Sequence, residues 1–165
     1  MKRALVTGLL LSLAANCPAA WWSLLSSDFQ EHRTLEAALA AAKASDQPVI
    51  IYYTRQRCPP CDVLRTRLSS DPLREHYAKA FHYAVIWGDQ MDSTERAGWR
   101  DRYGVSSAPT WVVMRSDGGY LCTAVGGFGS VEGGLRLFRL LQKAANVNVP
   151  AADVVRDCKR SALFD

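Results

Sequence analysis

The sequence lacks several features that would assign it to a functional class at once. Its 165 residues carry a formal net charge of only +4, and the lysines and arginines are scattered among acidic residues. Nucleic-acid-binding proteins usually show a basic stripe interleaved with aromatic residues, and this sequence has none. No internal repeat or low-complexity linker divides the chain. We therefore expect one domain without a nucleic-acid partner.

Motifs for cofactors and metals are also missing. The glycine-rich run GGFGS lacks the lysine and the strand-to-helix spacing of a phosphate-binding loop. A four-ligand zinc site would need a second Cys-X-X-Cys pair or paired histidines, whereas His32, His76 and His82 are expected on different elements. The sequence therefore predicts neither a cofactor nor a metal.

Long apolar runs are confined to the N-terminus. Lys2 and Arg3 precede the stretch ALVTGLLLSLAA, which is shorter than the roughly 20 residues that span a membrane. Small residues in NCPAA follow, so we interpret residues 1–20 as a cleaved export signal and the protein as periplasmic or secreted. The alternatives are an uncleaved anchor, a lipoprotein built on Cys17, and the first helix of a cytosolic protein.

The remaining sequence has the composition of a globular protein, with 48% apolar and 22% charged residues. Its pattern predicts helices at 34–45, 58–70, 72–80, 93–104 and 131–145, and strands at 49–54, 81–89, 110–115 and 120–125. Ser93 is the expected N-cap of its helix. The order gives an α/β fold with a mixed sheet of four to five strands between helices. We assign residues 21–145 to this domain and 146–165 to a C-terminal tail.

The motif with the clearest chemistry is Cys-Pro-Pro-Cys at residues 58–61. It follows the predicted strand 49–54, whose continuous apolar run indicates a buried strand, and it stands at the start of a predicted helix. This spacing brings both sulfurs within bonding reach, and the helix N-terminus favours a thiolate on Cys58. Arg55 and Arg57 add positive potential. The prolines have no N–H to offer the sulfur, which leaves the N–H of Cys61 as a donor. We predict that Cys58 is the attacking nucleophile and Cys61 the resolving thiol.

Two other interpretations of the Cys-Pro-Pro-Cys motif remain open at this point. It could contribute half of a metal site, or it could form a purely structural disulfide across a short loop. The position between a buried strand and a helix favours the redox pair.

A second motif carries a family resemblance. Pro109, in YGVSSAPTWVV, follows a helix and stands immediately before a strand. With VIIYYT leading into Cys-Pro-Pro-Cys, and with the hairpin followed by Gly-Gly and a last helix, residues 34–145 resemble the thioredoxin superfamily. The resemblance implies a thioredoxin fold, a cis-proline at Pro109 facing the cysteines, and an Ala108 backbone that binds an extended substrate peptide. An ordinary trans proline at the start of an edge strand is the alternative.

The wider layout is similar to the C-terminal thioredoxin-like domain of the bacterial transmembrane disulfide reductase. This similarity implies an exported thiol–disulfide oxidoreductase that exchanges disulfides with protein substrates, as a reductase more than as an oxidase, with a membrane disulfide reductase as a candidate redox partner. The alternatives are a non-catalytic binding module with a structural disulfide and a protein that carries metal on the two thiolates.

The sequence departs from the thioredoxin pattern around the motif. Tyr52 stands where thioredoxins have a buried aspartate, and Arg57 replaces a tryptophan. A phenol that titrates near 10 is a poor proton acceptor at neutral pH. Asp62 is a candidate to compensate, unless its side chain faces solvent.

Two further cysteines remain after export. Of the 5 cysteines in the sequence, Cys17 lies in the predicted signal and two form the motif, which leaves Cys122 on the last strand and Cys158 in the tail. In an oxidising compartment a structural disulfide between Cys122 and Cys158 is expected. A buried free Cys122, with Cys158 mobile or paired between molecules, is the alternative.

Overall fold

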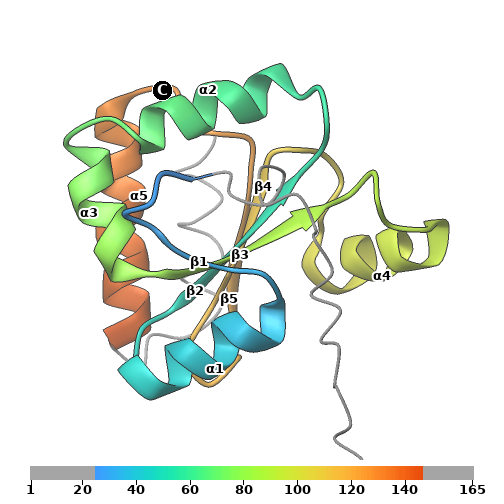
Figure 1. Ribbon diagram of the computed structural model, residues 1–165, viewed down its shortest axis with the longest axis horizontal. Helices are drawn as coiled ribbons and strands as arrows, with labels where there is room; N and C mark the ends of the chain where they lie inside the picture. The colour runs from blue at the N-terminus through green and yellow to red at the C-terminus, as the bar shows by residue number, and fades with distance from the viewer. Residues whose placement is uncertain (1–24, 147–165) are drawn as a thin grey trace, which may run out of the picture.

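The computed structural model describes residues 25–146, which form five strands and five helices (Figure 1). The elements are β1 (Gln30–His32), α1 (Leu35–Ser45), β2 (Val49–Thr54), α2 (Pro59–Leu68), α3 (Leu73–Ala80), β3 (His82–Trp87), α4 (Ser93–Tyr103), β4 (Thr110–Met114), β5 (Tyr120–Val125) and α5 (Val131–Asn146). The predicted export signal and the tail beyond Asn146 lie outside the described residues. Among residues 25–146, no helix is both long and apolar enough to cross a membrane.

The strands form one mixed sheet in the order β1-β3-β2-β4-β5. Strands β1 and β2 run parallel to β3, while β4 runs antiparallel to both β2 and β5. This is the α/β architecture with a mixed sheet that the sequence predicted. Its central strand, β2, is buried along its whole length, as expected from the continuous apolar run VIIYYT.

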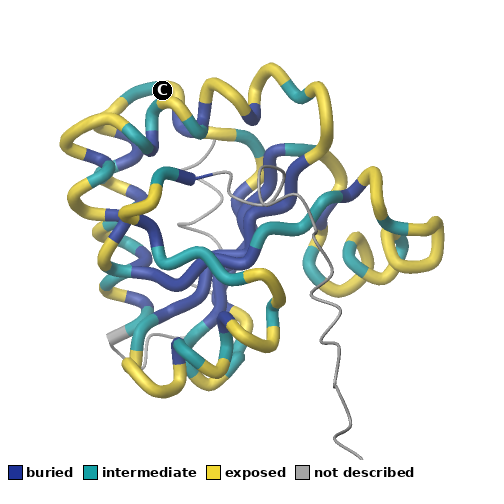
Figure 2. Tube along the Cα trace, in the orientation of Figure 1, coloured by how far each residue is buried: buried dark blue, intermediate teal, exposed yellow. Residues whose placement is uncertain are grey.

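Helices cover both faces of the sheet (Figures 1 and 2). One core cluster contains side chains of α2, α3 and α5, including Leu64, Tyr77 and Leu141, each no more than 1% exposed. The other contains Ala38 and Ala42 of α1, with α4 packed against its edge. Alternate residues of β2 enter the two clusters, so the strand joins both halves of the core.

Local sequence explains most helix ends, with one correction. The N-cap of α4 is Asp92 rather than Ser93, because Asp92 and Glu95 form a reciprocal capping box that a serine at position 93 would not complete. Gly104 ends that helix in the left-handed conformation, at φ 69°. On α5, Leu137 and Leu141 are buried, whereas Leu135, Phe138 and Leu140 only pack at the edge of the core.

The short strand β1 was not predicted as a separate element. Its three residues, Gln-Glu-His, are polar and half-buried, so they carry no strand-like hydrophobic pattern. Pairing with β3 forms this strand. It adds the fifth strand of the sheet and brings His32 next to β3.

The strand pairing brings together two histidines of separate elements, the half-buried His32 of β1 and the buried His82 of β3. His32 Nε2 lies 2.9 Å from His82 Nδ1, and Ser45 Oγ lies 2.8 Å from His82 Nε2. The tautomer of each imidazole ring sets which atom donates in these two contacts. Protons on both facing nitrogens, His32 Nε2 and His82 Nδ1, would break the bond between the rings. The described residues contain no group of three or more side chains that could hold a metal ion.

We expect this pair to make stability depend on pH. Burial, followed by the nearby His32, lowers the pKa of His82 below its usual 6.5. In acid the unfolded chain therefore takes up a proton that the folded protein does not. The free energy of unfolding should fall as the pH decreases through 6.5, and His82→Phe should remove this part of the pH dependence.

Urea unfolding of the wild type, His82→Phe and His76→Gln between pH 7.5 and pH 5.5 measures the effect. His76 is an exposed residue of α3, so its variant should keep the wild-type pH dependence. An unchanged pH dependence in His82→Phe would contradict the assignment.

Candidate active site

The two cysteines of the motif lie where β2 gives way to α2. Cys58 is the N-cap of α2 and Cys61 lies in its first turn. They form a disulfide, with Cα atoms 5.2 Å apart. Cys58 is partly exposed, whereas Cys61 is only 5% exposed. Only one end of the disulfide is therefore readily accessible from solvent.

The first turn of α2 has few free backbone donors. The residues at its first two positions are prolines, which have no N–H. The N–H of Cys61 donates to the carbonyl of Cys58 at 2.9 Å, and the N–H of Asp62 donates to the same oxygen. The expected bond from Cys61 to the Cys58 sulfur is therefore not formed in this disulfide state. A thiolate on Cys58 would depend on the helix dipole and on nearby cations more than on direct backbone hydrogen bonds.

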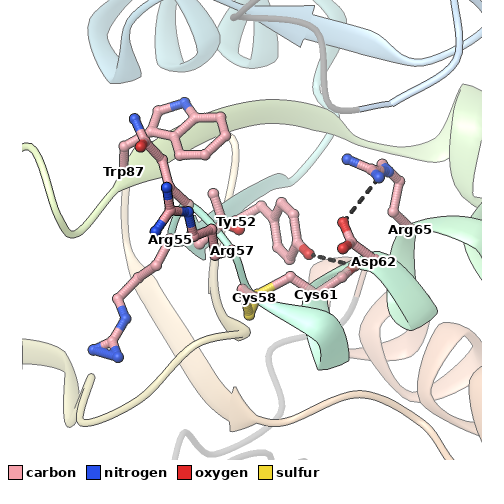
Figure 3. Close-up of a pocket in the computed structure, with 10 residues that line it drawn as sticks. Tyr52, Arg55, Arg57, Cys58, Cys61, Asp62, Arg65 and Trp87 are labelled. Carbon is pink, nitrogen blue, oxygen red and sulfur yellow. Dashed lines mark hydrogen bonds and ion pairs between the residues drawn. A yellow bond between two sulfur atoms is a disulfide. The ribbon is translucent and has the colours of Figure 1, made fainter.

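A pocket of about 370 Å³ opens beside the disulfide (Figure 3). Its lining includes three arginines and one aspartate, together with Tyr52, Thr54, Gln56, Trp87 and the two cysteines. In Figure 3, Arg55 and Arg57 lie on one side of the disulfide, and the Asp62–Arg65 pair lies on the other. The pocket is therefore positively charged next to Cys58.

Arg57, directly before Cys58, has an unusual backbone conformation. Its φ of 51° lies in the left-handed region, which costs a residue with a side chain about 1–2 kcal/mol. Glycine or asparagine would suit this backbone better. The backbone therefore does not explain an arginine at this position, and its long cationic side chain has to be considered as a functional group.

Tyr52 reaches from the central strand to the active-site helix. Its hydroxyl donates to the carbonyl of Cys61 at 3.2 Å, and the residue is 2% exposed. Burial raises its pKa to about 12, so the phenol keeps its proton at neutral pH. Tyr52 thus positions the first turn of α2 but cannot serve as a base.

Asp62 does not take over as a buried base. Its carboxylate accepts from Arg65 at 2.9 Å, and 61% of its side chain is exposed. This is the solvent-facing arrangement that the sequence left open. The contact was readable from the i,i+3 spacing of the two charges.

The Ala108–Pro109 peptide bond is cis in the structure. Tyr53 pairs with Thr110 in the sheet, so Pro109 lies at the carboxyl end of β2, the end from which the chain runs to Cys58. Pro109 is buried, and its carbonyl accepts from the N–H of Gly126 at 2.8 Å. Ala108 packs against the same core cluster as Cys58. Neither Ala108 nor Pro109 lines the arginine-rich pocket.

The other predicted pair is only partly within the described chain. Cys122 is fully buried on β5 and is disulfide-bonded. Its expected partner, Cys158, lies outside the described residues, so the 122–158 pairing stays a prediction.

The two strands that flank β2 each carry a tryptophan, and the two side chains lie in different surroundings. Trp111 is 2% exposed in the core, while Trp87 is partly exposed and lines the pocket. The indole N–H of Trp87 is buried and has no hydrogen-bond partner among the described residues. Strand alternation alone could not have found its place beside the cysteines.

The Tyr52 contact gives a testable expectation. Tyr52→Phe keeps the buried ring and removes one hydrogen bond, so the free energy of unfolding of the oxidised protein should fall by about 0.5–1.5 kcal/mol. Because the phenol titrates far above neutral pH, the pH profile of disulfide exchange between pH 6 and pH 9 should keep its shape.

Tyr83→Phe is the matched control, since the Tyr83 hydroxyl also donates to a buried carbonyl, that of Tyr77. It should lower stability similarly without acting at the site. Loss of an inflection near neutral pH in Tyr52→Phe alone would show that Tyr52 exchanges a proton after all.

Several solved structures have a similar fold. A thioredoxin from Thermus thermophilus aligns with a TM-score of 0.58 and 23% identity, covering 72% of this chain and 91% of that chain. A thioredoxin-fold protein from Helicobacter pylori gives 0.57 and 15% identity, with 87% and 92% covered. A putative disulphide-isomerase from Bacteroides thetaiotaomicron gives 0.54 and 20% identity, with 73% and 94% covered. These likenesses establish the thioredoxin fold.

No curated protein matches the sequence. The model of the thioredoxin-like domain family, however, matches residues 35–132, which is more than half of the chain. The chain therefore belongs to the thioredoxin-like domain family of the thioredoxin superfamily.

Proposed function

We propose that this protein is a thiol–disulfide oxidoreductase that exchanges disulfides with protein substrates through Cys58 and Cys61. The observation that supports this most is the disulfide between a partly exposed Cys58 and a buried Cys61 at the start of a helix. A purely structural disulfide would have no need of an accessible end beside an open, charged pocket.

The reaction begins with the reduced protein. The Cys58 thiolate attacks one sulfur of a substrate disulfide, which forms a mixed disulfide and releases the other substrate sulfur as a thiolate. Cys61 then attacks the Cys58 sulfur, which closes the 58–61 disulfide and releases the second substrate thiol. Two electrons pass from the protein to the substrate; of the two protons on the substrate thiols, one corresponds to that lost by Cys61 and the other comes from water.

Cys61 has to lose its proton before it attacks. Tyr52 touches its carbonyl but stays protonated, and Asp62 is exposed and paired with Arg65. The acceptor is therefore the departing substrate thiolate or water. Substrate binding at the backbone of Ala108, beside Pro109, belongs to the same proposal and keeps the released thiolate close to the site.

The direction and the compartment are further parts of the proposal. The similarity to the reductase domain noted in the sequence supports reduction of substrates over oxidation, with a membrane disulfide reductase resupplying electrons. The apolar stretch within residues 1–20 supports export to the periplasm or beyond the cell.

Insulin reduction by dithiothreitol tests the activity. The wild type should accelerate precipitation of the insulin B chain, and Cys58→Ala should not. Cys61→Ala should accumulate mixed disulfides through Cys58, because the resolving thiol is missing. If the wild type is no faster than Cys58→Ala, the proposal of reductase activity is wrong. A non-catalytic binding module would then bind its partner, and Cys58→Ala would leave that binding intact.

Equilibration with glutathione buffers tests the direction. A reductase should have a potential of the 58–61 pair near that of thioredoxin, about −270 mV, and an oxidase one nearer −120 mV. Mass spectrometry of the alkylated protein measures the reduced fraction at each buffer ratio. A value at the oxidising end would reverse the proposed direction and leave the exchange chemistry intact.

A further inference from the structure

We infer that the arginines beside the disulfide select substrates in which acidic residues flank the reactive cysteine. This rests on the proposed function, because it concerns what reaches Cys58. The two residues that carry it are Arg55 and Arg57, which line the pocket with Cys58 and lie on the same side of the disulfide (Figure 3).

The charge of these two arginines is not neutralised within the described residues. Neither side chain belongs to any of the ion pairs between described residues, whereas the third arginine of the pocket, Arg65, is paired with Asp62. Asp89, whose carboxylate contacts this loop, accepts from the backbone N–H of Gln56 at 2.9 Å. Two exposed guanidinium groups therefore remain available to a ligand.

The backbone at the start of α2 offers few free N–H groups, so the two arginines are the main local source of positive potential. At the start of α2 the two prolines have no N–H, and the N–H groups of Cys61 and Asp62 donate to the carbonyl of Cys58. Anions that approach Cys58 therefore meet guanidinium groups, which can bind a carboxylate through two parallel hydrogen bonds.

The geometry sets where a substrate carboxylate has to be. The attacked sulfur must reach Cys58, which follows Arg57 directly and Arg55 at a distance of three positions. An extended peptide advances about 3.4 Å per residue. Glutamates or aspartates one or two positions from the substrate cysteine are therefore within reach of the two side chains.

Position 57 carries an arginine, although asparagine or glycine would be easier to accommodate in its left-handed backbone. The same conformation allows a clean test, since Arg57→Asn removes the charge without demanding a new backbone. Arg55→Gln removes the second charge on an ordinary exposed residue.

The test uses the reduced protein and three peptides, each with one cysteine joined to a neutral 2-thiopyridyl group and flanked by glutamate, glutamine or lysine. Attack by Cys58 forms the protein–peptide disulfide and releases pyridine-2-thione, whose absorbance gives the rate. At low salt the wild type should react about tenfold faster with the glutamate peptide than with the lysine peptide. About 1 M salt should remove most of that difference.

In Arg55→Gln/Arg57→Asn the glutamate-to-lysine rate ratio should fall toward one, and in Arg55→Glu/Arg57→Asp it should invert. Lys43→Gln/Lys79→Gln is the matched control. It removes two exposed cations that precede β2 and β3, at the end of the sheet away from Cys58, and should keep the wild-type ratio.

The outcomes separate the two proposals. If the wild type shows no Cys58-dependent reaction with any peptide, the exchange activity itself is wrong. If all three peptides react equally fast, or if the control variant changes the ratio as much as the arginine variants do, the exchange activity stands and the selection of acidic substrates is wrong.

Discussion

The site depends on the burial of β2. Every residue of this strand is buried, because it lies between β3 and β4 and contributes side chains to both core clusters. The strand therefore fixes the point at which the chain leaves the sheet. Cys58 follows four residues after its end, and the antiparallel register with β4 places Pro109 at the same edge. Loss of packing around β2 would displace the nucleophile and the cis-proline together.

The first turn of α2 differs from the thioredoxin pattern at a few positions around the cysteine pair. Two prolines remove backbone donors, and the remaining N–H of Cys61 bonds to the carbonyl of Cys58. The Tyr52 hydroxyl, which keeps its proton, donates a hydrogen bond to the Cys61 carbonyl in that turn. Positive charge near the sulfur then comes from the helix dipole and from the arginines of the pocket. The resulting site has rigid backbone support and a cationic entrance, and it lacks an internal base among the described residues.

The elements with strong local patterns were predictable. The apolar run of β2, the hairpin around Ser-Asp-Gly-Gly and the amphipathic α5 all appear where the sequence placed them, and the cysteine pair lies at a helix start. Features that depend on long-range pairing were not predictable. The polar β1 forms only against β3, and with it the contact between His32 and His82. Likewise, no spacing rule links the Tyr52 hydroxyl to the Cys61 carbonyl, since the fold alone brings a strand under the helix.

The central claim is that Cys58 is the reactive thiolate and Cys61 the shielded partner. Alkylation of the reduced protein with iodoacetamide over a range of pH, followed by mass mapping of each cysteine, tests this most directly. Cys58 should react much faster than Cys61 at neutral pH, with a midpoint below the usual thiol value of about 8.5. Equal rates for the two cysteines, or a Cys58 midpoint at or above that value, would contradict it.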